Sequence, residues 1–138
     1  MKQPDAAAGE RHPIRVALAD DAPAVRYSLG MLLKTFPDFE FVGEATTGEE
    51  AIGLCERTQP DVLLLDLVMP GMGGLAALQE VRRRSPATQV VVVTSFVEDA
   101  HLRNALDQGA IGFLGKNATA DEISQAIHAA HAGEAVLS

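Results

Sequence analysis

The 138-residue sequence is poor in cysteine, in long apolar runs and in positive charge. Its one cysteine, Cys55, excludes an intrachain disulfide and suits a reducing compartment such as the cytoplasm. We expect Cys55 to be a small buried residue on a helix face, not a reactive thiol. No apolar run approaches the length that spans a bilayer. Residues 1–13 carry charges and no apolar core, so they do not resemble a secretory signal and are predicted to form a flexible tail.

Positive charge is scarce because 11 basic residues are set against 19 acidic ones, which gives a formal net charge of -8. A negative field repels nucleic acids and anionic membranes, since both attract cationic surfaces. We therefore expect this chain alone to bind neither DNA nor a membrane. With 47% hydrophobic and 22% charged residues, the composition is typical of one globular domain with a proper core.

Five short apolar runs alternate with five helical patterns. The continuously apolar segments 62–65 and 90–93 indicate strands that helices cover on both faces. In the last helical pattern, Thr119 and Glu122 have the spacing of a capping box. The predicted strands span residues 14–19, 39–45, 61–66, 89–94 and 111–114, and the predicted helices span residues 22–36, 49–57, 74–84, 98–108 and 120–132. This strict alternation predicts an α/β fold: a doubly wound, five-stranded parallel sheet flanked by five helices.

Polar side chains stand at the carboxyl ends of the predicted strands. The residues concerned are Asp20 and Asp21 after the first strand, Asp66 at the end of the third, Thr94 at the end of the fourth and Lys116 after the fifth. In a doubly wound sheet, ligands bind beyond this edge. We therefore expect these side chains to converge on one pocket.

Three carboxylates in one pocket predict a metal site. A pair of them about 4 Å apart repels by roughly 4 kcal/mol at an effective dielectric near 20, so the cluster must hold either protons or a cation. Oxygen ligands with room for water favour Mg²⁺. Asp66 is then the candidate nucleophile, because a carboxylate can accept a phosphoryl group when the charge on that group is neutralised. The magnesium ion, the Lys116 ammonium and the Thr94 hydroxyl would surround it.

Four segments carry these residues, and together they resemble a known family. The segments are residues 17–23 (ALADDAP), 64–72 (LLDLVMPGM), 93–95 (VTS) and 109–116 (GAIGFLGK). In this order, each at a predicted strand end, they are similar to the receiver domain of two-component response regulators. The last segment, with Gly133-Glu134, resembles the NarL/FixJ (LuxR-type) branch. The resemblance covers about residues 14–132 and implies a flavodoxin-like, CheY-like sheet with strand order 2-1-3-4-5.

The resemblance implies which residues bind the metal and which accept the phosphoryl group. Asp66 would be phosphorylated by a partner sensor histidine kinase. Asp21 and Asp66 would bind Mg²⁺ directly, and Asp20 would act largely through water. The main-chain carbonyl of Val68 would complete the protein ligands.

The resemblance also implies a conformational switch. Thr94 would move to the phosphoryl group, Phe113 would rotate inward behind it, and Lys116 would pair with a phosphoryl oxygen. Val68 and Phe96 would flank the phosphoryl group, and both are apolar, so they cannot orient an attacking water. We therefore predict a phosphoacceptor signalling domain, not an enzyme, with slow self-dephosphorylation at most.

The implied organisation is a tail at residues 1–13, a receiver domain at 14–133 and the start of a linker at 134–138. Regulators of the resembled branch carry a helix-turn-helix domain after the receiver. We therefore expect this chain to be part of a longer protein that binds DNA through that domain and regulates transcription. Whether the chain forms a homodimer on phosphorylation, and through which face, is left open.

Three other functions compete with this one. A pseudo-receiver would bind partners without phosphorylation. A flavin- or nucleotide-binding protein would need a loop after the first strand that cradles phosphate, but that loop is acidic and contains Pro23, which has no amide hydrogen. An aspartate-based phosphatase places its nucleophile and its acid two residues apart, whereas Asp20 and Asp21 are adjacent and cannot both face the same way along the strand.

Overall fold

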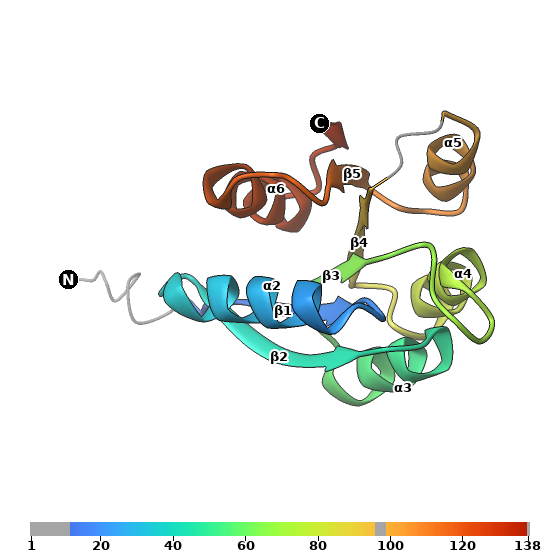
Figure 1. The fold of residues 1–138 in the computed structure, drawn as a ribbon, viewed down its shortest axis with the longest axis horizontal. Helices are drawn as coiled ribbons and strands as arrows, with labels where there is room; N and C mark the ends of the chain where they lie inside the picture. The colour runs from blue at the N-terminus through green and yellow to red at the C-terminus, as the bar shows by residue number, and fades with distance from the viewer. Residues whose placement is uncertain (1–11, 96–98, 138) are drawn as a thin grey trace.

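Strands and helices alternate along the chain in the computed structural model, which describes residues 12–95 and 99–137 (Figure 1). The strands are β1 (Ile14–Ala19), β2 (Phe39–Ala45), β3 (Val62–Leu65), β4 (Gln89–Thr94), β5 (Gly112–Gly115) and β6 (Val136–Leu137). The helices are α2 (Pro23–Thr35), α3 (Gly48–Thr58), α4 (Gly74–Arg84), α5 (Asp99–Asp107) and α6 (Ala120–His131). Among the described residues, no helix has the length and apolar character needed to cross a membrane. Most of the predicted tail, residues 1–11, lies outside the described residues, as do Phe96 and Glu98.

All strands of the sheet run parallel, in the order β2-β1-β3-β4-β5-β6. The first five positions confirm the predicted order 2-1-3-4-5. The short strand β6 was not predicted, because residues 134–138 were assigned to the start of a linker. A strand of two residues has too few positions to show an alternating pattern, and only its pairing with β5 reveals it.

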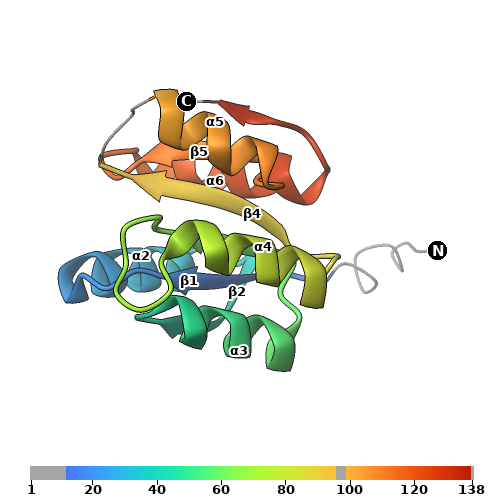
Figure 2. The same ribbon diagram turned by 90° about the vertical axis from the view of Figure 1, so that its right-hand side faces the viewer.

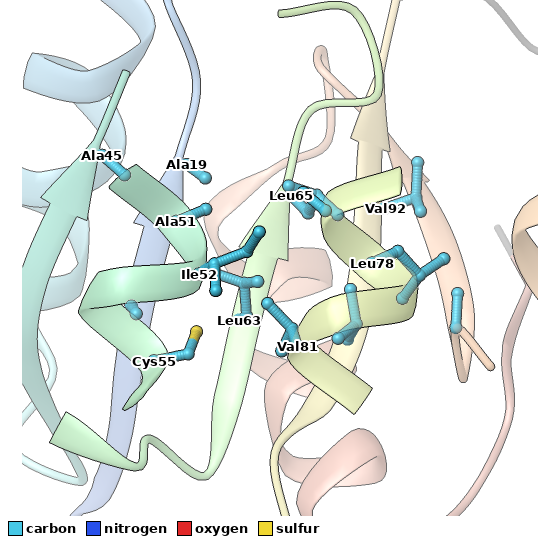
Figure 3. Close-up of a cluster of buried hydrophobic side chains, with 14 of the residues drawn as sticks. Ala19, Ala45, Ala51, Ile52, Cys55, Leu63, Leu65, Leu78, Val81 and Val92 are labelled. Atoms are coloured by element: carbon cyan, nitrogen blue, oxygen red, sulfur yellow. The ribbon is translucent and has the colours of Figure 1, made fainter. Parts of the chain in front are cut away.

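Helices cover both faces of the sheet. Helices α3, α4 and α5 lie on one face, and α2 and α6 lie on the other (Figures 1 and 2). The four residues of β3 are all buried, as predicted for a strand between two helical layers. Leu63 and Leu65 point into the core beneath α3 and α4, shown in Figure 3, while Val62 and Leu64 point to the opposite core.

A local sequence signal places the start of α6. In α6 the predicted capping box is present: the Glu122 amide donates to Thr119 Oγ1 at 3.1 Å, and the Thr119 amide donates to Glu122 Oε1 at 2.8 Å. Strand β5 begins and ends one residue later than predicted, because its ladder with β4 places Gly115 opposite Thr94. This register brings the residue after β5 to the edge of the sheet where β4 ends.

Cys55 is a core residue, as predicted. It lies on α3 beside Ala51 and is 1% exposed (Figure 3). Burial raises the pKa of the Cys55 thiol to about 12. The thiol therefore stays protonated at neutral pH and behaves as a small apolar side chain.

Candidate functional site

An acidic cluster lies at the carboxyl edge of the sheet. Asp20, Asp21 and Asp66 each offer one carboxylate oxygen, and these oxygens all lie within 4.8 Å of one another. Asp20 directly follows β1 and Asp66 directly follows β3, and both are buried, whereas Asp21 is exposed. The structure thus brings together carboxylates that follow two different strands, β1 and β3.

Lys116 is the cation of this cluster. Its Nζ lies 3.1 Å from Asp20 Oδ2 and 3.2 Å from Asp66 Oδ2, so one ammonium bridges two strands. Its backbone amide donates to the carbonyl of Thr94 at 3.0 Å, which anchors the residue at the end of β4. Burial by itself would lower the pKa of Lys116, but the two carboxylates outweigh it and raise the pKa. The ammonium therefore stays charged at neutral pH.

Asp66 is held in an environment that disfavours its charge. Burial raises the pKa of Asp66, and the neighbouring Asp20 carboxylate raises it further. The Val68 amide, which donates to Asp66 Oδ1 at 3.0 Å, and the Lys116 ammonium oppose this rise. Among the described residues, Lys116 is the one ammonium paired with these three carboxylates, so the site carries more negative than positive charge. A divalent cation would balance the excess.

A cavity of about 200 Å³ opens beside the carboxylates. Its lining consists of Asp21, Asp66, Val68, Thr94, Ser95 and Lys116. The Thr94 side chain is buried at the end of β4, whereas the Val68 side chain is 68% exposed. The cavity is therefore polar at its base and has an apolar side chain at its rim.

Phe113, the predicted switch aromatic, is not among the residues that line this cavity. It lies on β5, where its backbone pairs with Val92 of β4, and its half-buried ring packs against the core beneath α3, α4 and α5. Because Phe113 is three residues before Lys116 on the same strand segment, a shift of β5 would move both residues.

Two residues that contribute to the site were missed from the sequence. Arg26 of α2 donates through Nη1 to the backbone carbonyl of Asp20 at 2.9 Å and pairs through Nε with Glu44 of β2 at 3.2 Å. The guanidinium therefore ties the end of β1 to both neighbouring elements. An arginine one helical turn after Ala22 was the available signal, but only the pairing of β1 with β2 shows that Glu44 lies within reach.

The loop after β3 is held close to two helices. The Met72 amide donates to Glu49 Oε1 of α3 at 3.4 Å. A Cβ placed on Gly74, the first residue of α4, would lie 2.3 Å from the Cα of Leu67 and 2.7 Å from the carbonyl oxygen of Asp66. A residue with a side chain at position 74 would therefore displace the segment that carries Asp66 and Val68.

The donor set fits a small, hard cation. Mg²⁺ binds six oxygens at about 2.0–2.1 Å, which places adjacent ligands about 3.0 Å apart and opposite ligands about 4.2 Å apart. Carboxylate oxygens within 4.8 Å of one another can share one such ion after small side-chain rotations. The adjacent cavity leaves room for water and for a tetrahedral anion. These residues could therefore hold a divalent cation next to an anionic ligand.

Comparison with known proteins agrees with this arrangement. The family model described as the response regulator receiver domain matches residues 16–128, which include every residue of the acidic cluster and Lys116. The chain belongs to this family. The receiver domain is 41% identical over 124 residues to the transcriptional regulatory protein LiaR of Bacillus subtilis. That match covers 90% of the chain and 59% of LiaR, so the chain spans less than two thirds of this relative's length.

Solved structures show the same fold. The signal receiver domain of the putative response regulator NarL from Mycobacterium tuberculosis has a TM-score of 0.85 and 36% sequence identity, and the match covers 89% of this chain and 99% of that one. The isolated receiver domain of RcsB from Salmonella enterica serovar Typhimurium, solved in the presence of the phosphomimetic BeF3-, has a TM-score of 0.82 and 25% identity, with 92% and 94% covered. The receiver domain described here is thus similar to NarL-type response regulators of two-component systems.

Proposed function

We propose that this receiver domain accepts a phosphoryl group on Asp66 in a magnesium-dependent reaction and passes the signal on as a change in surface. The observation that carries the proposal is the meeting of Asp20, Asp21, Asp66 and Lys116 beside one cavity. The RcsB receiver was solved with a phosphomimetic, which supports a phosphoryl group as the ligand of this cavity. A cluster that served only to stabilise the fold would not need three carboxylates that repel one another.

The chain's own residues divide the chemistry of the transfer. A carboxylate oxygen of Asp66 forms a bond to phosphorus while the bond from phosphorus to the donor's leaving atom breaks, and the leaving group keeps that electron pair. The Val68 amide orients the carboxylate through Oδ1. Lys116 and the Thr94 hydroxyl would face the phosphoryl oxygens, on which negative charge is spread in the transition state.

Mg²⁺ would be held by Asp21, Asp66 and the main-chain carbonyl of Val68, with Asp20 acting through water. When bound, the ion would neutralise charge on the carboxylates and on the phosphoryl oxygens. The Lys116 ammonium, which bridges Asp20 and Asp66 in this structure, would then be free to turn toward the phosphoryl group.

The partners follow from the family and from the relatives' names. A sensor histidine kinase would be the phosphoryl donor, and the reaction would take place in the cytoplasm. LiaR is a transcriptional regulatory protein, so we infer a transcriptional output for a longer protein that contains this receiver, with DNA bound by a C-terminal helix-turn-helix domain. Phosphorylation would change the association of two copies or of domains through the face that β5 and its flanking helices form.

Acetyl phosphate provides a test without a kinase. Incubation of the chain with acetyl phosphate and Mg²⁺ should add one phosphoryl group per chain, measured by intact mass, with acetate as the leaving group. The same incubation in EDTA should add none, because the carboxylate cluster then repels the incoming anion. An equal adduct in EDTA would contradict the metal requirement. No adduct in either condition would contradict the proposed function and favour an interaction module that works without phosphorylation.

Loss of the phosphoryl group should be slow in this chain. Val68 lines the cavity with an exposed apolar side chain and cannot hold an attacking water in line. The double substitution Val68→Asn with Phe96→Glu supplies polar groups and should speed dephosphorylation by about tenfold or more, which is less than the roughly 10²–10⁴-fold of a positioned general acid or base because the new groups only orient water. Loss of the adduct is followed by intact mass after the acetyl phosphate is removed.

The matched control for this substitution is Val68→Ala, which shortens the same side chain and leaves it apolar. It should lose phosphate at the native rate. If the Asn/Glu variant also does so, the apolar residues are not the reason for a long-lived phosphoryl group.

A further inference from the structure

The outer edge of β5 is covered by β6, a strand of the same chain. After α6 the chain reverses at Gly133 (φ 81), whose amide donates to the carbonyl of Ala130 at 3.0 Å, while the Glu134 amide donates to Ala129 at 2.8 Å. Residues 134–137 then run back along β5, and β6 pairs with it in parallel. We call residues 134–137 the β6 latch.

Gly112 provides the seat of the β6 latch. In the ladder, Gly112 lies opposite Val136, and the Val136 amide donates to the carbonyl of Ile111 at 3.2 Å. A Cβ placed on Gly112 would lie 1.8 Å from the carbonyl oxygen of Val136, and its three nearest heavy atoms would all belong to Val136. A side chain at position 112 would therefore collide with the backbone of the β6 latch before it met any other part of the protein. The glycine is what allows the strand to approach.

The β6 latch is weakly held. In the part of the chain that the structure describes, it forms two residue pairs with β5, and the Val136 side chain is buried in the core beneath α6. Glu134 and Ala135 are exposed. A cavity of about 270 Å³ remains between the latch and α6, lined by Gln125, Ala129 and Val136 among others. Short elements with few buried contacts open at a lower free energy than the core strands of a folded protein.

The β6 latch is also connected to the phosphoacceptor edge. Phe113 pairs through its backbone with Leu137 of the latch on one side and with Val92 of β4 on the other. Two residues further along β5, Gly115 pairs with Thr94, and Lys116 follows. Because β6 is parallel to β5, the chain at Leu137 heads toward the same edge as Asp66; in Figure 2 the red arrow of β6 points the same way as β4.

We propose that the edge of β5 is a strand-docking surface whose occupant is the β6 latch, and that phosphorylation of Asp66 releases this occupant. The packing of the latch at Gly112 is argued from the geometry around that residue alone. Its release by phosphorylation of Asp66 rests on the proposed function. Movement of Thr94 and Phe113 toward the phosphoryl group shifts the strand that the latch pairs with. Since the described residues of the latch pair with this strand at Gly112 and Phe113, the shift detaches the latch, and the released edge of β5 offers unpaired backbone groups to another extended segment.

Amide hydrogen exchange at Val136 tests whether Gly112 allows the latch to pack on β5. In Gly112→Ala the exchange at the Val136 amide should accelerate by about tenfold or more relative to the native chain, as expected when a local structural unit opens. The matched control is Gly30→Ala on α2, where the added Cβ would meet Phe41 at an ordinary 3.5 Å. A second variant, Val136→Ala, shortens the side chain that the latch buries beneath α6 without touching β5, and it should accelerate exchange at the same Val136 amide. If exchange at the Val136 amide in Gly112→Ala equals that of the native chain and of Gly30→Ala, then Gly112 is not what allows the latch to pack on β5.

The coupling is tested on the native chain treated with acetyl phosphate and Mg²⁺, with intact mass and exchange measured on the same sample. A chain that carries the adduct should show faster exchange at residues 134–137, in the direction of Gly112→Ala. An adduct that leaves this protection unchanged overturns the coupling. A chain that takes no adduct contradicts the proposed function and the coupling together, while Gly112→Ala still decides the seat by itself. Protection that rises with protein concentration would show that the strand comes from a second copy, and would overturn the intramolecular latch.

Discussion

Replacing Asp66 with asparagine should abolish phosphorylation of this receiver domain by acetyl phosphate. The amide is nearly the same size as the carboxylate, and its oxygen can still accept the hydrogen bond from the Val68 amide, so the loop after β3 should keep its place. A neutral amide, however, has no oxygen nucleophilic enough to attack phosphorus. Intact mass after incubation with Mg²⁺ should show the adduct on the native chain and none on Asp66→Asn.

The control for this experiment is Asp107→Asn. Asp107 is an exposed carboxylate at the end of α5, the end that lies away from the acidic cluster, so its variant carries the same change in charge. It should be phosphorylated at the native rate. A phosphoryl group that still appears on Asp66→Asn would place the acceptor elsewhere, with Asp20 and Asp21 as the next carboxylates to replace. An unchanged circular dichroism spectrum of Asp66→Asn would show that the variant is folded, so that unfolding does not explain the missing phosphorylation.

Replacing Leu78 with alanine should destabilise the domain by about 3 kcal/mol, within the range of about 2–5 kcal/mol found for buried leucines. Leu78 lies on α4 with no exposed surface and packs in the core against β3 and β4 (Figure 3). The strand backbones beneath it are fixed by their ladders, so the site cannot collapse to fill the space. Urea unfolding should show a lower midpoint with an unchanged slope.

The matched control is Leu106→Ala on α5, where the leucine is 37% exposed. It should cost less than about 1 kcal/mol, as is usual for residues that leave no cavity. Equal destabilisation by the two substitutions would mean that the core beneath α4 is not the close-packed centre of the domain. It would also weaken the argument that Asp66 is held on a rigid base.

The central strand β3 and the outer strand β5 have different roles in the proposed switch. The phosphoacceptor follows β3, the central strand with four buried residues, so its carboxylate is fixed before any ligand arrives. The strand proposed to respond, β5, has one face open enough to leave Phe113 half-buried and carries a short strand at its outer edge. A local charge change at Asp66 can therefore have its largest effect where the sheet is held least firmly.

Secondary structure could be predicted from the sequence because its signals are local. The continuous apolar runs of β3 and β4, the helical spacing in α4 and the capping box at Thr119 each depend on residues a few positions apart. The outcome at β5 shows the limit. Its apolar run predicted residues 111–114, but the ladder with β4 decides which residues pair, and it selects Gly112–Gly115.

By itself, the sequence determined the alternation of elements, the parallel sheet and the set of polar residues at its carboxyl edge, since each element follows from a pattern within a short stretch of chain and the parallel sheet follows from the order of the elements. Tertiary structure alone decided that Lys116 bridges Asp20 and Asp66, that Arg26 joins Asp20 to Glu44, and that residues 136–137 add a strand beside Gly112. Those contacts join residues far apart in the chain. Their distances depend on strand register and on how closely backbones approach, which no local pattern of side chains encodes.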